Sequence, residues 1–303
     1  MKKTQGLFLL LVTLLGYACS NRPILQDKPL IAKREIIDDL GRSVTVPERI
    51  ERVVSLAPNL TENVFAVGAG DRLVGVTTFC NFPDAARAIP KIGDTMTPNL
   101  ETIVALKPDV VLVSTASQIE TFSSTLASNG ISVYVTDPDS IEGLFRGLTQ
   151  LGRLFGTETK AGDVVADLRR RLKVVENRRP ERSAPAFVQI SDEPLFTIGK
   201  QSFLTEAIET VGARSLTADV ESAYPKLSKE TAAKLDPSII ILSESPDNRE
   251  PNDVFRNSPA VRNDCIVHIN ADIISRPGAR LIDALEQIET AVNDFRAAGK
   301  LKD

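Results

Sequence analysis

Two segments of this chain nearly repeat each other, and this repetition constrains the fold more than any other feature. Leu60–Ala69 has the sequence LTENVFAVGA, and Leu204–Ala213 has the sequence LTEAIETVGA. A second pair follows in the same order, with ETIVALKPDVVLVS beginning at Glu101 and ETAAKLDPSIIILS beginning at Glu230. Each member of the second pair combines a Glu-Thr start, a helical stretch, Leu-x-Pro and a short apolar run.

A third, shorter pair lies between the first two in each half: IPKIG begins at Ile89 and YPKLS begins at Tyr224. Spacings of this length far exceed the periods of solenoid repeats. One explanation is that all helix–turn–strand units have similar compositions. The shared order and wording of the three pairs favour a different one, namely two lobes of similar fold.

Short apolar runs alternate with helical patterns in both halves, which is typical of α/β folds with parallel sheets. Before them, Arg34–Pro47 predicts a β-hairpin that turns at Gly41. In the first half we expect a helix after Pro58, capped by Asn59 or Thr61 and ended by Gly68. The predicted strands are RVVSLAP, DRLVGVT, DVVLVS and ISVYVT in the first half, and AFVQIS, SIIILS and VRNDCIVHIN in the second.

Between Ser140 and Arg179 the strand pattern stops and two helical segments follow each other. The second has an apolar stripe formed by Ala161, Val164, Val165, Leu168, Leu172 and Val175. About 20 helical residues span about 30 Å, which suits a rigid connector between lobes. We therefore predict an α/β fold of two similar lobes with parallel-rich sheets, joined by one long helix. The predicted parts are a signal peptide (1–18), a tether (19–33), an N-terminal lobe (34–139), a helical connector (140–180) and a C-terminal lobe (181–303).

The N-terminus has the pattern of an export signal. Lys2 and Lys3 precede an apolar core, Gly6–Leu15, which is too short to span a bilayer as a stable helix. Ala18 then precedes Cys19, which resembles the lipobox of bacterial lipoproteins, in which the cysteine is acylated. Gly16 and Tyr17 depart from the usual lipobox, so secretion with an unmodified Cys19 is the alternative. We expect a lipoprotein in the periplasm or on the cell surface.

Charge and cysteine content restrict the possible functions of the exported chain. Removing Lys2 and Lys3 from the 36 basic side chains leaves 34 against 40 acidic ones, a formal charge of −6. Such a chain has no basic footprint for nucleic acid. Beyond Cys19, the two remaining cysteines are Cys80 and Cys265, in different halves, and we expect them to be unpaired.

The sequence contains no recognisable catalytic or metal-binding motif. Its one histidine, His268, alternates with apolar residues in a predicted strand, as structural histidines do. Zinc-ligand spacings, a nucleophile elbow and a phosphate loop are all missing from the sequence. An exported hydrolase that uses two carboxylates is one interpretation. Ligand capture between lobes is the preferred one, because several aromatic residues occur in loops at predicted strand ends: Phe79, Phe82, Phe196 and Tyr224.

Several phrases of the chain, which together cover most of it, resemble the periplasmic binding proteins of ABC importers for cobalamin and iron complexes. They are DDLGRSVTVP, RVVSLAPNLTE, TFCNFP, PNLETIVALKPDVVL, PLFTIGKQSF, YPKLS and NADIISRPGARLIDALE. TFCNFP and SRPGARL are most similar to the cobalamin branch. The resemblance implies a monomeric, non-enzymatic protein that captures a cobalamin-like corrinoid and delivers it to a homodimeric permease with ATPase subunits. A haem or a ferric siderophore is the alternative ligand.

The resemblance also implies roles for individual residues. Those that match pocket positions of the family are Pro58, Phe79, Phe82, Phe196, Tyr224 and Arg276. Tyr224 stands where cobalamin binders often carry Trp, a residue that this chain lacks. The repeated Glu101 and Glu230 match family positions that pair with permease arginines. Each also begins a predicted helix, where the helix dipole by itself favours a carboxylate.

Overall fold

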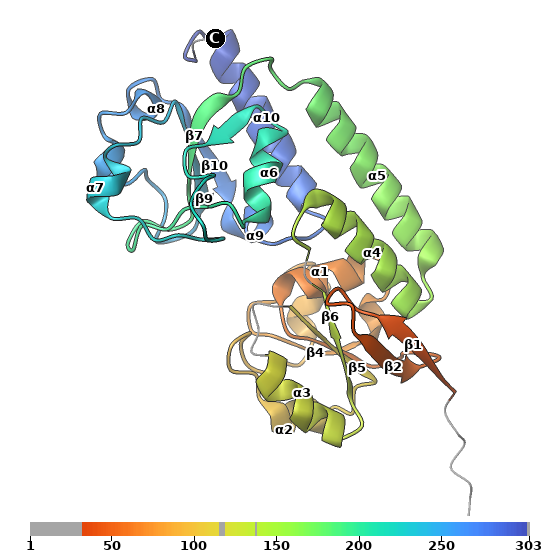
Figure 1. Cartoon of the computed structure of the whole chain (residues 1–303). Helices are drawn as coiled ribbons and strands as arrows, with labels where there is room; N and C mark the ends of the chain where they lie inside the picture. Colours follow the sequence, from red (N-terminus) through yellow and green to blue (C-terminus); the bar gives the residue numbers. More distant parts are fainter. Residues whose placement is uncertain (1–31, 115–118, 137, 302–303) are drawn as a thin grey trace, which may run out of the picture. The chain divides into compact units, whose positions relative to one another are not determined.

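The computed structural model describes residues 32–114, 119–136 and 138–301. The predicted signal peptide and Cys19 lie outside the described residues. From Lys33 onward the chain forms one unit, whose elements are shown in Figure 1.

The described chain begins with the expected hairpin. Strands β1 (Lys33–Ile37) and β2 (Ser43–Pro47) pair antiparallel. Gly41 has φ +74°, a left-handed conformation that glycine adopts without a steric penalty. The buried carboxylate of Asp38 accepts hydrogen bonds from the backbone N–H groups of Leu40 and Arg42, which holds the turn closed.

The first lobe is built on a parallel sheet with the strand order β4-β3-β5-β6. Its elements are β3 (Val53–Ser55), α1 (Pro58–Ala66), β4 (Leu73–Val76), α2 (Leu100–Ala105), β5 (Val110–Val113), α3 (Ile119–Ser128) and β6 (Ser132–Val135), with 3-10 turns η1 (Gly70–Arg72) and η2 (Asp84–Ala88). Every residue of β3 and β5 is buried. Parallel strands covered on both faces are apolar throughout, which explains the continuous apolar runs of the sequence.

Helix α1 starts differently from the sequence prediction. Its N-cap is Ala57, which makes no side-chain cap hydrogen bond, and Pro58 occupies the first turn. The prediction of Asn59 or Thr61 as the cap is therefore wrong. Proline suits the first turn because its missing N–H would be unpaired there in any case. Thr61 lies within the helix, and its hydroxyl donates to Ser55 Oγ at 2.9 Å. Gly68, at φ +82°, follows the end of the helix as expected.

The second lobe repeats this arrangement, since its parallel sheet has the order β8-β7-β9-β10. Its elements are β7 (Ala184–Gln189), α6 (Phe203–Glu209), β8 (Ala213–Ser215), α7 (Lys229–Ala232), β9 (Ile239–Glu244), η3 (Asp253–Phe255), α8 (Pro259–Arg262), β10 (Ile266–Asn270), α9 (Ala271–Ile274) and α10 (Leu281–Ala297). Both sheets follow the same chain path, so the prediction of two similar lobes is confirmed.

Two details of the second lobe differ from the sequence prediction. The helix predicted from SKETAAKL contracts to the four residues of α7. The strand predicted from VRNDCIVHIN begins only at Ile266, because Val261 and Arg262 belong to helix α8. Ser258 caps α8 by accepting a hydrogen bond from Val261 N, and this local cap outweighs the β-propensity of the valine.

Two helices, α4 (Ile141–Phe155) and α5 (Glu158–Asn177), occupy the segment between the two sheets. The Ser140 side chain caps α4 by accepting from Gly143 N, and Gly156, at φ +65°, ends it. The two helices approach closely at Gly152, where an added Cβ would lie 2.5 Å from the Ala161 side chain. The 20-residue helix α5 then runs beside α10 (Figure 1), and Arg171 pairs there with Asp283 and Glu286.

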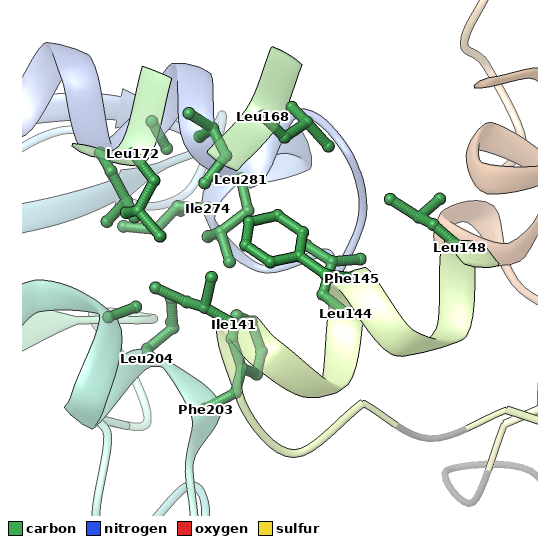
Figure 2. Close-up of a cluster of buried hydrophobic side chains, with 14 of the residues drawn as sticks. Ile141, Leu144, Phe145, Leu148, Leu168, Leu172, Phe203, Leu204, Ile274 and Leu281 are labelled. Atoms are coloured by element: carbon green, nitrogen blue, oxygen red, sulfur yellow. The ribbon is translucent and has the colours of Figure 1, made fainter. Parts of the chain in front are cut away.

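A single apolar cluster joins both lobes to these helices. Figure 2 shows Ile141, Leu144 and Phe145 of α4 meeting side chains from several other elements. These partners are Leu168 and Leu172 of α5, Phe203 and Leu204 at α6, Ile274 of α9 and Leu281 of α10. Because the side chains of this cluster are buried, separating the lobes would expose a large apolar area to water.

Replacing Phe145 by Ala tests the importance of this cluster. The side chain is 1% exposed, so Phe145→Ala should lower the free energy of unfolding by about 3–5 kcal/mol through lost burial and a residual cavity. Urea denaturation measures the change. Val174→Ala on α5 is the control, since Val174 is 42% exposed and its truncation should cost little. Equal effects of the two changes would contradict the assignment of Phe145 to the shared core.

Candidate functional site

A pocket of about 510 Å³ is lined by residues of both lobes. On the first-lobe side, Ala57 and Pro58 follow β3, Ser114 follows β5, and Thr136 follows β6. The remaining lining residues are Asn59, Thr95, Pro138, Asp139, Gln201, Ser202, Phe203, Ala223, Tyr224, Ser275, Arg276 and Pro277. The pocket therefore lies at the carboxyl ends of parallel strands, where open α/β sheets bind their ligands.

Three of the six pocket residues expected from the sequence line this cavity: Pro58, Tyr224 and Arg276. Phe79 and Phe82 are not among the lining residues and are 59% and 43% exposed. Phe196 is half-buried, and its backbone pairs with Lys226 in the loop that carries Tyr224. The structure thus brings Tyr224 and Arg276 to one pocket, and places Phe79, Phe82 and Phe196 in the loops around it.

Tyr224 combines an apolar ring with a hydroxyl that hydrogen-bonds Ser202. Desolvation raises the pKa of the phenol above its ordinary value, and the Ser202 hydrogen bond offsets part of that rise. Tyr224 is therefore a neutral phenol at physiological pH. Much of the surrounding wall is also polar and uncharged, with hydroxyl and amide groups from Asn59, Thr95, Ser114, Thr136, Gln201 and Ser202.

Arg276 belongs to the second lobe but is held largely by the first. Its Nη1 donates to Glu62 Oε1 at 2.7 Å and to Asn81 Oδ1 at 2.9 Å. Its Nη2 donates to Asp272 Oδ1 at 2.6 Å and, at 3.4 Å, to the carbonyl oxygen of Phe79. The guanidinium is 13% exposed, so these charge-assisted bonds form in a largely desolvated position and fix its orientation.

Glu62 lies between two arginines of the second lobe, and the sequence analysis did not identify it as important. Arg280 donates to both of its carboxylate oxygens, at 2.6 and 2.8 Å, while Arg276 shares Oε1. The side chain of Glu62 is 3% exposed. Its repeat partner in sequence, Glu206, is exposed. The repeat thus contains both glutamates but gives no signal that only Glu62 joins the lobes.

Arg280 also explains the position of Phe82. Its guanidinium carbon lies 4.0 Å from the centroid of the Phe82 ring, within the range of a cation–π contact. Nearby, the Asn63 side chain accepts from Ala279 N at 3.2 Å. The loop carrying Phe79 and Phe82 and the segment 272–280 therefore form a polar contact between the lobes, beside the pocket.

Glu101 and Glu230 occupy matching places in the two lobes. They lie in the first turns of α2 and α7, which are capped by Asn99 and Ser228 through hydrogen bonds from the N–H groups of the third residue on. Glu101 is exposed, and the side chain of Glu230 is 86% exposed, with Lys234 Nζ at 3.6 Å from Oε1. The local geometry thus presents both carboxylates to solvent.

Cys80 and Cys265 are buried free thiols, so they are unpaired as expected. The described residues contain no group of three or more His, Cys, Asp or Glu side chains placed to hold a metal ion. None of the helices that the structure describes is long and apolar enough to cross a membrane.

Two α/β lobes with the same strand order, joined by packed helices around a shared pocket, define a two-lobed ligand-binding protein. Residues 53–273 match the family model described as periplasmic binding protein. The chain belongs to this family and is a periplasmic binding protein of the ABC importer type. Its relatives are solute-binding proteins, so the interpretation as a carboxylate-dependent hydrolase is discarded.

Three similar proteins illustrate the range of the family. An uncharacterised ABC transporter substrate-binding lipoprotein of Bacillus subtilis, YvrC, is 28% identical, covering 96% of this chain and 98% of its own. The crystal structure of the periplasmic vitamin B12 binding protein BtuF of Vibrio cholerae has a TM-score of 0.74 at 27% identity, covering 82% of this chain and 98% of that one. The periplasmic heme binding protein HutB of Vibrio cholerae has a TM-score of 0.72, covering 80% and 98% of the two chains; at 21% identity, this likeness concerns the fold alone.

Proposed function

We propose that this protein captures a cobalamin-like corrinoid between its lobes and delivers it to a membrane permease. The observation that carries the proposal is the pocket between the lobes, which combines Tyr224 with a wall of uncharged hydroxyl and amide groups. The vitamin B12-binding relative supports the same ligand class.

The chemistry of a corrinoid suits this pocket. Its macrocycle is large and rigid, and its rim carries amide side chains that donate and accept hydrogen bonds. Hydroxyl and amide groups such as Thr136 and Gln201 match those amides without adding charge. The apolar faces of Phe203 and Tyr224 offer surface for the ring. Because the apolar cluster already joins the lobes, little further ordering is needed on binding.

Haem is the second candidate ligand, and Tyr224 is the observation that favours it, since a tyrosine can ligate haem iron. Two features of the wall weaken this candidate. Desolvation raises the pKa of the phenol, which disfavours the phenolate that would bind iron. The lining residues include no histidine, methionine or cysteine. We therefore rank cobalamin above haem, and a ferric siderophore remains the third possibility within the same family.

Calorimetry with cyanocobalamin, haem and a ferric siderophore tests the ligand. We expect one cyanocobalamin per chain, and Tyr224→Ala should weaken its binding by about 1–3 kcal/mol because an aromatic contact is lost. Tyr224→Phe, which retains the ring, is the control and should bind nearly as well as the natural protein. Tight siderophore binding without any response to cyanocobalamin would refute the corrinoid assignment.

The exposed ring of Phe79 provides a matching test in the first lobe. We propose that it lies against the part of the macrocycle that projects from the pocket, opposite Tyr224. Phe79→Ala should then weaken cyanocobalamin binding by about 1–3 kcal/mol without changing the thermal midpoint of the unliganded protein. Unchanged affinity would exclude Phe79 from the site.

We propose further that Glu101 and Glu230 dock on basic residues of a homodimeric permease. A homodimer presents two identical surfaces related by a twofold axis. Two lobes of matching topology present the two carboxylates from equivalent helix starts, which fits such a partner. The helix dipole by itself accounts for a glutamate at one helix start, but the exposure of both side chains leaves them accessible to a partner.

Reversal of both charges, Glu101→Arg with Glu230→Arg, should abolish assembly with the permease and ligand-stimulated transport. Ligand affinity of the isolated protein should stay nearly unchanged, since neither residue lines the pocket. The control pair is Glu158→Arg with Glu181→Arg, two exposed positions of which Glu158 also lies in the first turn of a helix. Co-purification at physiological salt measures assembly. A complex that survives the first pair would exclude this docking mode.

We also propose that Cys19 is the acylated N-terminus of the mature protein. The apolar core followed by Ala18-Cys19 supports this, as does the B. subtilis relative, whose name includes lipoprotein. Mass spectrometry of the membrane-extracted protein should find a diacyl or triacyl adduct on Cys19, and Cys19→Ser should release the chain from the membrane. Recovery of the natural protein as an unmodified soluble chain would disprove the anchor.

A further inference from the structure

The polar contact beside the pocket contains two arginines and two carboxylates. Arg276 and Arg280 face Glu62 and Asp272, so the formal charges of the four side chains cancel. Glu62 belongs to the first lobe, and the other three lie on the segment 272–280 of the second. We call these four side chains the charge cluster. Of its members, Arg276 alone lines the pocket.

Arg276 has few donors left for a ligand. A guanidinium grips a carboxylate through two parallel N–H bonds. The two terminal nitrogens of Arg276 carry four N–H groups, and the protein supplies four acceptors for them: Glu62, Asn81, Asp272 and the Phe79 carbonyl. Its charge is matched in the same way, because carboxylates contact both terminal nitrogens. Arg276 thus presents the pocket with a neutralised and occupied guanidinium.

We propose that Glu62 determines the charge preference of the pocket. By neutralising Arg276 and Arg280, it makes the site accept uncharged ligands and disfavour analogues that carry a carboxylate. Glu62 does not line the pocket and acts through Arg276, so it is a positioning residue. The inference rests on the proposed function, because it concerns the ligand bound between the lobes.

The position of Glu62 makes its charge more effective than that of an exposed residue. Its side chain is 3% exposed, and charges in such a site are poorly screened by water. Removing this negative charge would leave the cluster with a net charge of +1 next to the pocket. A ligand carboxylate would then gain an attractive partner, whereas a neutral amide at the same place would gain little.

Asp272 provides a graded comparison. It pairs with Arg276 and also accepts from Asn81 Nδ2 at 2.7 Å, but its side chain is 39% exposed. Water screens a charge at this position more strongly, so neutralising Asp272 should change the preference in the same direction but by less. The predicted order of effect is therefore Glu62→Gln above Asp272→Asn.

The experiment uses two pairs of probes that differ in charge. The first pair is cyanocobalamin and its monocarboxylate, in which one side-chain amide is hydrolysed. The second pair is iron protoporphyrin IX and its dimethyl ester. Dissociation constants for each pair give the preference of the full chain for the acid over the neutral form. Glu62→Gln should shift that preference toward the acid by tenfold or more (about 1.4 kcal/mol), and Asp272→Asn by about threefold, in line with stronger screening.

Glu286→Gln is the matched control. Glu286 also forms a two-pronged pair with an arginine, Arg171, but on the α5–α10 contact and not at the pocket. It should leave the acid-to-neutral preference unchanged even if it lowers stability. Thermal unfolding of every variant confirms that the folded chain is being compared, and Asp272→Asn decides the question if Glu62→Gln does not fold.

The outcomes separate this inference from the proposed function. Binding of the porphyrin pair alone would refute the corrinoid assignment while still testing Glu62. An unchanged preference in folded Glu62→Gln, or in Asp272→Asn if that is the folded variant, would overturn the role of the charge cluster. The same shift in Glu286→Gln would overturn it too, since the effect would then be one of general charge. Failure of the natural protein to bind any of the four probes would overturn both proposals.

Discussion

The arrangement of the whole binding site depends on one apolar cluster that continues from the first lobe to the second. Ile141, Leu144 and Phe145 of α4 pack against Leu168 and Leu172 of α5 and against side chains of α6, α9 and α10. Burial of this surface joins both lobes to the same helices, and any wide separation would expose it to water. The pocket walls are therefore set largely before a ligand arrives, which suits a rigid macrocycle.

Around this apolar connection the polar contacts between the lobes have a different role. Burying a charge is costly unless it is paired and hydrogen-bonded, and pairing recovers only part of that cost. Glu62 with Arg276 and Arg280 thus adds little certain stability beyond the cluster. Its consequence lies in orientation and electrostatics, because it holds a pocket-lining arginine in one position and balances its charge.

Much of the fold could be predicted from the sequence, because local patterns encode it. The buried strands appear as apolar runs, and Gly41, Gly68 and Gly156 take positive φ values at a turn or helix end. The errors arose where local patterns compete. Pro58 starts α1 without a side-chain cap, and the Ser258 cap draws Val261 into a helix. In the candidate site, Pro58, Tyr224 and Arg276 reach the pocket, whereas nothing in the sequence distinguished them from Phe79, Phe82 and Phe196.

The sequence by itself determined the two-lobed α/β architecture and the family, since repeated phrases and periodic apolar residues depend only on neighbours along the chain. The tertiary structure alone decided which repeated residues share an environment. Glu62 and Glu206 occupy the same place in nearly identical phrases, yet one is buried between two arginines and the other is exposed. Arg276 lies 214 positions from Glu62. Their contact exists because the helices between the lobes bring α1 against the segment 272–280, and no local pattern records that packing.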